Sequence, residues 1–179
     1  MQKGVFFDRD GVLNRAIIKG GKPYPPTDIH ELEIPSEVAP ALIALKNAGF
    51  CLIGVTNQPD VVRGITTRVT VEAINTVLLD TLPLTAMLVC YHDDKDACAC
   101  RKPQPGLLLQ AAEQYQLDLR QSFMIGDRWR DVEAGNNAGS QTIWLDYDYA
   151  EKKPEHPTFI THSLTAAVEW ILRGNNNGD

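Results

Sequence analysis

The stretch Gly4-Val5-Phe6-Phe7-Asp8-Arg9-Asp10-Gly11 decides the fold class of this chain. An apolar run between a glycine and an acidic cluster is typical of a short strand buried on both faces. Residues i and i+2 of an extended segment point the same way, so we expect Asp8 and Asp10 to present two carboxylates to one spot. By itself, Asp-x-Asp-Gly is also typical of an ordinary turn capped by an aspartate. The rest of the chain has to decide between these interpretations.

Strand-like runs alternate with helix-like segments along the whole sequence. The expected strands are 4–8, 50–56, 86–91, 122–125 and 142–145. The expected helices are 36–48, 69–82, 105–115, 127–138 and a last one capped by Ser163. For the first helix, Ser36 is the expected N-cap and Gly49 the residue that ends it. This alternation predicts an α/β fold, a doubly wound parallel sheet of the Rossmann-like type with helices on both faces.

The composition is that of one ordinary globular domain, with 179 residues, 44% of them apolar and 22% charged. A net charge of −6 opposes binding to nucleic acid or anionic lipid through counterion release. No apolar run approaches the ~20 residues of a membrane helix, so no membrane partner is expected. The acidic cluster comes too early for a signal peptide, which indicates a cytoplasmic protein.

No linker or internal repeat divides the chain. We therefore expect a single domain over residues 1–174, followed by an asparagine-rich disordered tail at 175–179. No insertion is large enough to form a separate cap domain, so the site is expected to be open. We expect a monomer.

Polar residues that directly follow the strands are the candidates for chemistry, because ligands bind at the carboxyl ends of such strands. Besides Asp8 and Asp10, these are Thr56-Asn57-Gln58, Arg101-Lys102 before a helix, and Asp127 with Asp131 one turn later. Each group alone has an ordinary explanation as a cap, a solvated pair or a dipole partner. Together they predict converging carboxylates that suit Mg²⁺, with a lysine and a hydroxyl for a phosphoryl group.

The four motifs in this order resemble those of the haloacid dehalogenase-like phosphohydrolases. They are Asp8-x-Asp10-Gly11, Thr56, Lys102 and Gly126-Asp127-x-x-x-Asp131, and the resemblance runs from about residue 4 to residue 145. The strings Asp8 to Asn14, Thr56-Asn57-Gln58 and Cys-Arg-Lys-Pro at 100–103 narrow it to one subgroup. That subgroup contains the D,D-heptose 1,7-bisphosphate phosphatases and the phosphatase part of the histidinol-phosphate phosphatases.

Within this subgroup, Val61-Val62-Arg63-Gly64 favours the heptose enzymes, which serve lipopolysaccharide heptose biosynthesis. The five-residue spacer between His92 and Cys98 and the Gly126-Asp127-Arg128 string resemble the histidinol enzymes. We expect the heptose activity, as a D-glycero-D-manno-heptose 1,7-bisphosphate 7-phosphatase, with histidinol phosphate or another small sugar phosphate as the alternative substrate. Pro59-Asp60 stands where the subgroup usually has small residues including glycine.

The resemblance implies a role for each motif. Asp8 would be the nucleophile that forms an aspartyl-phosphate, and Asp10 the general acid and base. Asp8, the Asp10 carbonyl and Asp127 would hold Mg²⁺, with Asp131 in support. Thr56 and Lys102 would bind the phosphoryl oxygens. The expected contacts to the rest of a small phosphorylated metabolite are Asn57, Arg63, Arg101 and Arg128, whose surplus positive charge favours a bisphosphate.

The cluster Cys90-x-His92-x5-Cys98-x-Cys100 supplies three thiols and an imidazole, a tetrahedral Zn²⁺ ligand set. In the same subgroup a loop of this composition binds structural zinc immediately before Arg-Lys-Pro. The alternatives are unconnected thiols beside a surface histidine, or a strained disulfide between Cys98 and Cys100. We expect substrate contacts from this loop, from the 14–34 loop and from the loop after Gln58.

A function of another class also fits an acidic cluster with a threonine and a lysine, namely a phospho-accepting signalling module. Such a receiver needs a long-lived acyl phosphate, whereas Asp10 stands where it would hydrolyse one. The Asp-x-Asp-Gly motif and the zinc loop therefore favour the enzyme.

Overall fold

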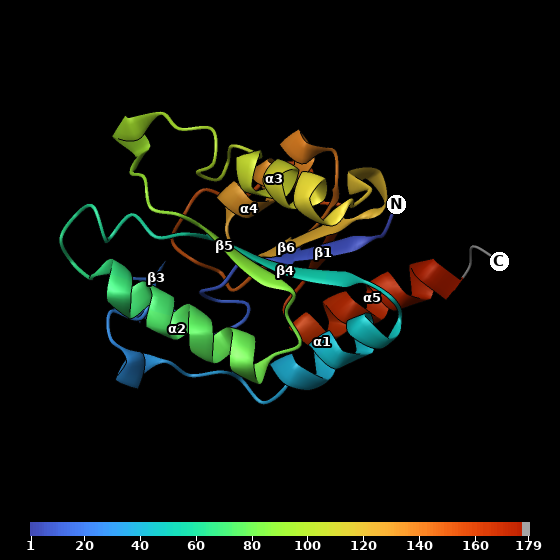
Figure 1. Cartoon of the computed structure of the whole chain (residues 1–179), viewed down its shortest axis with the longest axis horizontal. Coiled ribbons are helices and arrows are strands. Elements are labelled where there is room, and N and C mark those ends of the chain that lie inside the picture. The colour runs from blue at the N-terminus through green and yellow to red at the C-terminus, as the bar shows by residue number, and fades with distance from the viewer. Residues whose placement is uncertain (177–179) are drawn as a thin grey trace.

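A six-stranded parallel sheet forms the centre of the molecule (Figure 1). The computed structural model describes residues 1–176. The strand order is β5-β4-β1-β6-β7-β8, and each adjacent pair is parallel. The strands of this sheet are β1 (Gly4–Phe7), β4 (Cys51–Asn57), β5 (Ala86–Cys90), β6 (Phe123–Gly126), β7 (Gln141–Leu145) and β8 (Phe159–Thr161).

Helices cover both faces of the sheet, as the sequence predicts. On one face lie α3 (Gly106–Tyr115) and α4 (Trp129–Ala138), which contact each other and strands β4 to β7. On the other face lie α1 (Val38–Asn47), α2 (Arg68–Thr81) and α5 (Leu164–Asn176), below the sheet in Figure 1. The doubly wound fold class is therefore confirmed.

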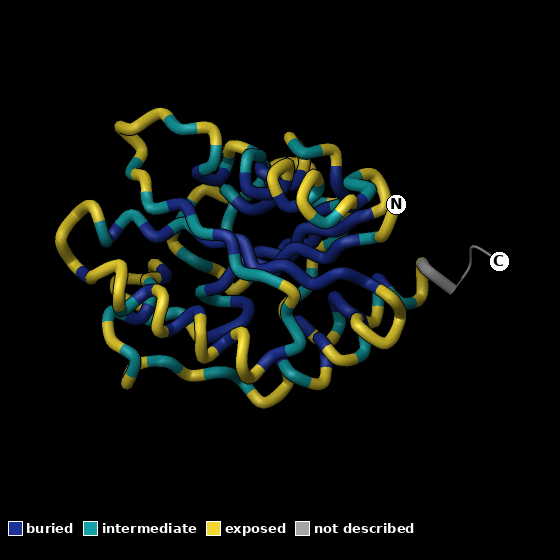
Figure 2. Tube along the Cα trace, viewed as in Figure 1, coloured by how far each residue is buried: buried dark blue, intermediate teal, exposed yellow. Residues whose placement is uncertain are grey.

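The central strands are mainly apolar because both faces of the sheet are covered. Alternate side chains of a strand point to opposite faces. Accordingly Val5 and Phe7 belong to the core shared with α1 and α5, whereas Phe6 belongs to the core shared with α3 and α4. The central strands are the deeply buried part of the trace in Figure 2.

Short elements occupy the connections between the main strands and helices. An antiparallel hairpin, β2 (Ile17–Lys19) with β3 (Lys22–Tyr24), lies in the 14–34 loop that the sequence leaves unassigned. Single turns of 3-10 helix are η1 (Ile29–Glu31), η2 (Asp94–Asp96) and η3 (Leu119–Gln121). The hairpin is far too small to be a second domain.

Three features differ from what the sequence predicts. The N-cap of α1 is Glu37 instead of Ser36, and no side chain caps that helix. The edge strand β8 has no predicted counterpart, since its three residues alternate too briefly to stand out. Helix α5 runs to Asn176 and so includes the first two residues of the expected tail, while 177–179 lie outside the described residues.

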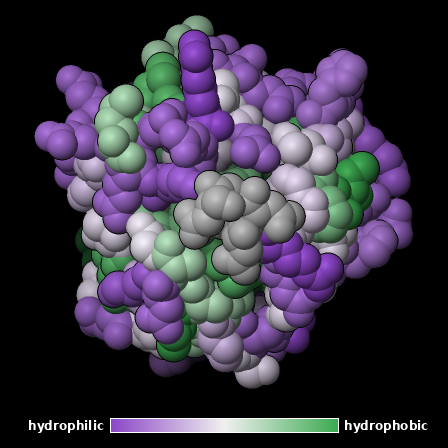
Figure 3. Space-filling model, turned by 90° about the vertical axis from the view of Figure 1, so that its right-hand side faces the viewer, coloured by the Kyte–Doolittle hydropathy of each residue, from purple (hydrophilic) through white to green (hydrophobic). Residues whose placement is uncertain are grey.

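The strands all end at the side where the long connections gather, on the left of Figure 1. At this edge β1 lies between β4 and β6, where the chain changes direction across the sheet, the usual ligand position in such folds. The opposite face, with the chain ends, presents mostly hydrophilic side chains in the part that Figure 3 leaves visible. Among the described residues, no helix is long and apolar enough to cross a membrane.

Candidate active site

A small cavity of about 50 Å³ opens at the carboxyl ends of the strands and brings together part of the predicted site. It is lined by six predicted site residues, together with residues of the hairpin region and helix α4. The predicted ones are Asp8, Asp10, Asn57, Lys102, Arg128 and Asp131. The others are Pro23, Tyr24, Pro25 and Arg130. The hairpin thus supplies the side of the cavity that the sequence assigned to the 14–34 loop.

Lys102 is the centre of the charge network. Its Nζ lies 2.7 Å from Asp8 Oδ1 and 2.7 Å from Asp131 Oδ1, and it donates to the Val55 carbonyl at 2.8 Å. The side chain is only 2% exposed. Burial lowers the pKa of Lys102, but the carboxylates of Asp131 and Asp8 outweigh burial and raise the pKa to about 12. The lysine therefore stays charged and holds one oxygen of each acid.

Asp8, Asp127 and Asp131 form a group whose carboxylate oxygens lie within 4.8 Å of one another. Burial and the charge of Asp131 raise the pKa of Asp8 to about 6, against the lowering effect of Lys102. Burial and the charges of Asp8 and Asp131 raise the pKa of Asp127 well above its ordinary value. Three acids beside one lysine thus leave uncompensated negative charge at this spot.

The surroundings of Asp127 test whether this group suits a cation. Its Oδ1 is buried and has no hydrogen-bond partner among the described residues, while Oδ2 accepts from the Tyr149 hydroxyl at 2.9 Å. The Trp144 indole donates to the Asp127 carbonyl at 3.1 Å. A Cβ on Gly11, whose φ is +98°, would lie 1.9 Å from Oδ2. The Asp127 carboxylate is thus fixed in place with one oxygen free beside Asp8, and such oxygen ligands suit a hard cation such as Mg²⁺.

Asp131 is already engaged through both of its oxygens. Oδ1 pairs with Lys102, and Oδ2 accepts from the backbone N–H of Arg128 at 3.0 Å, at the start of α4. Lys102 thus compensates the charge of Asp131 beside Asp127. The sequence expected both aspartates inside the helix, but α4 begins only at Trp129.

Asp10 lies in a network of donors. It accepts from Arg9 Nε at 3.1 Å, from Asn14 Nδ2 at 3.1 Å and from Gln58 Nε2 at 2.7 Å. Gln58 also donates to Thr56 Oγ1 at 2.9 Å, so one amide links two predicted catalytic residues. Arg9 is fully buried and donates in addition to Asn75 of α2 at 3.0 Å.

Asn57 holds the Lys102 backbone with two reciprocal hydrogen bonds. Its Nδ2 donates to the Lys102 carbonyl at 3.0 Å, and its Oδ1 accepts from the Lys102 N–H at 3.1 Å. The residue expected to contact substrate therefore also ties the end of β4 to the segment that carries the lysine.

The predicted arginines are paired with acids. The net positive charge that they offer to a substrate is therefore smaller than the sequence indicates. Arg63 pairs with Asp93 at 2.5 Å and with Asp60 at 3.3 Å, Arg101 with Asp94 at 2.9 Å, and Arg128 with Glu151. The described residues that line the cavity include Arg128 but neither Arg63 nor Arg101. Asp60, part of the unusual Pro59-Asp60 pair, is thereby neutralised by Arg63.

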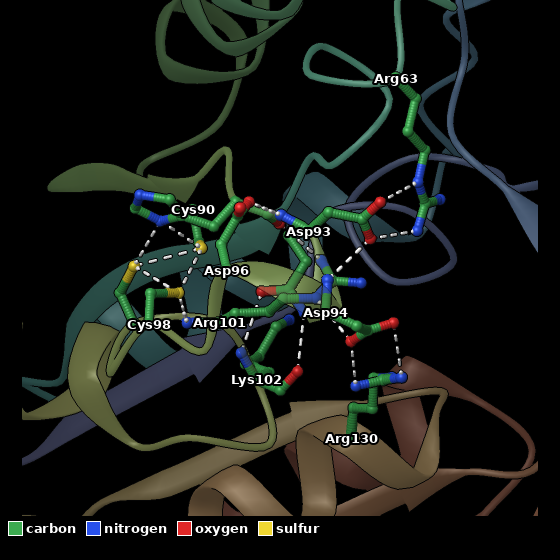
Figure 4. Close-up of polar contacts among 12 residues, drawn as sticks. Arg63, Cys90, Asp93, Asp94, Asp96, Cys98, Arg101, Lys102 and Arg130 are labelled. Carbon is green, nitrogen blue, oxygen red and sulfur yellow. Dashed lines mark hydrogen bonds and ion pairs between the residues drawn. The ribbon is translucent and has the colours of Figure 1, made fainter.

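Asp94 of η2 connects the loop of residues 91–105 to the cavity (Figure 4). Its carboxylate lies 2.9 Å from Arg101 Nε and 3.1 Å from Arg130 Nη1. Arg130, which lines the cavity, also lies against the Trp129 ring at 4.6 Å from the ring centroid. Sequence reasoning missed Arg130 as a cavity residue, since it occupies an unspecified position of the fourth motif.

The four predicted zinc ligands meet at one point, Cys90 from the end of β5 and the other three from this loop. Among the three thiols the Sγ–Sγ distances are 3.2 to 3.7 Å, and His92 Nδ1 lies 3.4 and 3.5 Å from two of them. Cys98 and Cys100 are 3.5 Å apart and free, so the alternative of a disulfide is wrong. Burial raises the pKa of Cys98, but hydrogen bonds from the Arg101 N–H and with Cys100 outweigh burial and lower this pKa to about 7.

The sequence is similar to those of known phosphatases over nearly its whole length. It is 34% identical over 175 residues to D-glycero-beta-D-manno-heptose-1,7-bisphosphate 7-phosphatase of Helicobacter pylori strain J99, covering 94% of this chain and 97% of that protein. The enzyme of the same name from Escherichia coli K12 is 31% identical over 181 residues, covering 94% and 87%. The HAD-hydrolase-like family model matches residues 99–167. The chain belongs to the haloacid dehalogenase-like phosphatases.

A solved structure of this phosphatase family agrees with the fold. The crystal structure of D,D-heptose 1,7-bisphosphate phosphatase from B. bronchiseptica, complexed with magnesium and phosphate, has a TM-score of 0.81 and 27% identity. The match covers 96% of this chain and 99% of that one. The expected family is therefore confirmed, and the chain is an enzyme of the phosphatase class.

The short motifs supply the acids and the lysine of the cavity, yet several contacts come from outside them. Tyr149 and Glu151 follow β7 in a polar segment with no recognisable pattern, and Asn75 lies in the middle of α2. A weak signal existed for Arg9, because an arginine between two aspartates provides charge balance when the strand end is buried. Nothing in the sequence indicates the other three.

Proposed function

We propose that this chain removes the 7-phosphate of D-glycero-beta-D-manno-heptose 1,7-bisphosphate in a Mg²⁺-dependent reaction through an aspartyl-phosphate. The observation that carries the mechanism is the setting of Asp8, whose Oδ1 is held by Lys102 beside the free oxygen of Asp127. The relatives of this name support the choice of substrate. On this proposal the enzyme acts in lipopolysaccharide heptose synthesis and is located in the cytoplasm.

In the first half-reaction an Asp8 oxygen forms a bond to phosphorus, and the bond from phosphorus to the sugar oxygen breaks. Asp10 donates its proton to the departing sugar oxygen. In the second, Asp10 takes a proton from water, the water oxygen bonds to phosphorus, and phosphate leaves as Asp8 is restored. The donors around Asp10 hold its carboxylate at the cavity wall, where it serves both steps.

The metal residues on this proposal are Asp8, Asp127 and the Asp10 carbonyl. Bound Mg²⁺ supplies the positive charge that a carboxylate needs in order to approach a phosphate dianion. Asp131 supports the site from behind, because its two oxygens already bind Lys102 and the start of α4. Lys102 and Thr56 bind the phosphoryl oxygens, and Asn57 keeps Lys102 in place.

The substrate's second phosphate would lie toward the arginines. Arg128 and Arg130 line the cavity. Arg101 and Arg63 lie outside the cavity lining and are paired with Asp94 and Asp93, and an anionic group of the substrate would replace those aspartates as their partner. Zinc at Cys90, His92, Cys98 and Cys100 would order the loop between β5 and Lys102.

An Asp8→Asn variant tests the nucleophile, because an amide does not attack phosphorus. We expect phosphate release to fall at least 10³-fold while the circular dichroism spectrum stays that of the wild type. Near wild-type release by this variant would exclude the proposed mechanism. Many phosphates released per wild-type chain exclude the alternative of a signalling receiver, which releases less than one.

Competition among substrates tests specificity. Both anomers of the heptose bisphosphate, histidinol phosphate and a panel of sugar monophosphates are compared by kcat/KM. We expect the beta anomer of the bisphosphate to lead. A clear preference for histidinol phosphate would overturn the proposed substrate and leave the phosphatase mechanism intact.

A further inference from the structure

Three consecutive residues after β7 each contact a different part of the active site. The Tyr149 hydroxyl donates to Asp127 Oδ2 at 2.9 Å, and the Ala150 N–H donates to the Gly21 carbonyl in the hairpin turn at 2.8 Å. Glu151 accepts from Arg128 Nε at 2.9 Å. We propose that residues 149–151 are a positioning segment that aims a metal ligand, holds the hairpin and orients a substrate-binding arginine. The inference rests on the proposed function of the same site.

The first contact determines which oxygen of Asp127 is left for the cation. Asp127 is 2% exposed, so neither oxygen is fully served by water. The Tyr149 hydroxyl occupies Oδ2 and leaves Oδ1 without a partner among the described residues. Outer hydrogen bonds of this kind orient metal ligands, and their loss commonly weakens metal binding about 10- to 100-fold.

The second contact holds the hairpin beside the cavity. Gly21 adopts a φ of +75°, and a Cβ there would lie 3.1 Å from the Ala150 Cβ, so the two backbones approach closely. The hairpin region supplies Pro23 and Tyr24 to the cavity wall. Fixing its turn to residue 150 therefore fixes that wall relative to Asp127.

The third contact concerns Arg128, whose side chain is 35% exposed and lines the cavity. Both Glu151 oxygens accept from its guanidinium, so the planar fork has a defined direction. Residues 150 and 151 form a bend in which the Glu151 N–H donates to the Tyr149 carbonyl at 2.8 Å, and from this turned segment one side chain contacts Asp127 and another contacts Arg128.

The segment has its own support apart from the active site. The Asp146 N–H donates to Thr161 of β8 at 2.8 Å, and Asp148 N–H donates to Asp146 Oδ1 at 3.0 Å. The Tyr147 and Tyr149 rings lie 5.9 Å apart. Removal of a single contact to the site is therefore expected to leave the segment in place.

The test compares Tyr149→Phe with Tyr147→Phe. The control removes the hydroxyl of an exposed tyrosine two residues earlier in the chain. Mg²⁺ alone is titrated onto the full-length protein purified without chelator, and the thermal unfolding midpoint is followed. We expect Tyr149→Phe to need about 10-fold more Mg²⁺ and to have a lower midpoint without Mg²⁺, because buried Oδ2 loses its donor, whereas Tyr147→Phe keeps the Mg²⁺ dependence of the wild type. Wild-type Mg²⁺ dependence in Tyr149→Phe would overturn the assignment.

Glu151→Gln tests the arm toward Arg128, with the exposed Glu155→Gln as the control for a lost charge. We expect KM for the phosphorylated substrate to rise at least threefold with kcat and Mg²⁺ dependence nearly unchanged, and no change in the control. Equal KM values for the two variants would overturn this arm. A wild type that shows the Mg²⁺ effects but hydrolyses no heptose bisphosphate would refute the proposed substrate and leave the positioning segment standing.

Discussion

Lys102 is the residue on which the charge balance of the site depends most. It stands between Asp8 and Asp131, 2.7 Å from an oxygen of each, and its third partner is the Val55 carbonyl. Buried acids remain ionised only where such a partner compensates the loss of water. The same residue is therefore needed both for the fold and for the phosphoryl group that the site is proposed to bind.

Lys102→Met removes this partner and leaves two buried carboxylates uncompensated. Breaking a buried pair in this way costs about 3–5 kcal/mol, and we expect that loss in the free energy of unfolding by urea, together with loss of turnover. Lys152→Met is the control, because Lys152 is 53% exposed and pairs with Glu133 on the surface, a contact that stabilises by about 0–1 kcal/mol. Equal stability losses in the two variants would contradict this account.

Gly11 is a second residue with a measurable role. Gly11→Ala places a Cβ 1.9 Å from Asp127 Oδ2 at a φ of +98°. Gly49 has a φ of +88° and no atom within 4 Å of its Cβ position, so Gly49→Ala carries the backbone strain alone. Strain costs about 1 kcal/mol in each, whereas only Gly11→Ala displaces the carboxylate. We expect a larger loss of stability and weaker Mg²⁺ binding for Gly11→Ala, and a Gly49→Ala variant with the same defect would argue against it.

At the scale of elements, the connection from β5 to α3 carries both the thiol cluster and Lys102. Cys100 and Lys102 are two residues apart, and Arg101 between them contacts Cys98 through its N–H and Asp94 through its side chain. Figure 4 shows the cysteines at one end of this network and Arg130 at the other. An ion among the thiols would therefore order the same loop that delivers the lysine.

Cys98→Ala tests the zinc proposal, with Cys51→Ala as its control, since Cys51 is a buried cysteine of β4 outside the cluster. We expect about one zinc per chain in the wild type and in Cys51→Ala, and less than a tenth of that in Cys98→Ala. Elemental analysis after purification without chelator measures the content. A folded wild type without zinc would refute the proposal.

At the scale of the whole molecule, the acidic cluster makes stability depend on pH. Folding raises the pKa of Asp8 from an ordinary 3.8 to about 6, so protonation favours the folded state. This stabilisation is fully present below pH 3.8 and is lost as the pH rises through about 6. Without added Mg²⁺, we expect the thermal unfolding midpoint of the wild type to rise relative to that of Asp8→Asn as the pH is lowered from about 7.5 to about 5.5. Parallel pH profiles of the two proteins would contradict this.

The sequence by itself determined five of the six strands of the sheet, the five main helices and the motif residues. An apolar strand, a helix with a glycine after it and a polar group at the next strand end are local patterns, and local patterns determine order along the chain. Since all strands of a parallel sheet end at one edge, Asp8, Lys102 and Asp131 were brought together by topology that the alternation already implied.

Only the tertiary structure decided how each charge is partnered. Tyr149 contacts Asp127 across 22 positions of the sequence, and Arg9 contacts Asn75 across 66. Glu151 pairs with Arg128, which the sequence analysis expected to bind substrate. Such contacts depend on where irregular segments pack, and hydrophobic periodicity carries no information about that. A buried carboxylate is satisfied by whichever donor the packed chain places within about 3 Å of it, and that distance exists only once the layers have closed around the sheet.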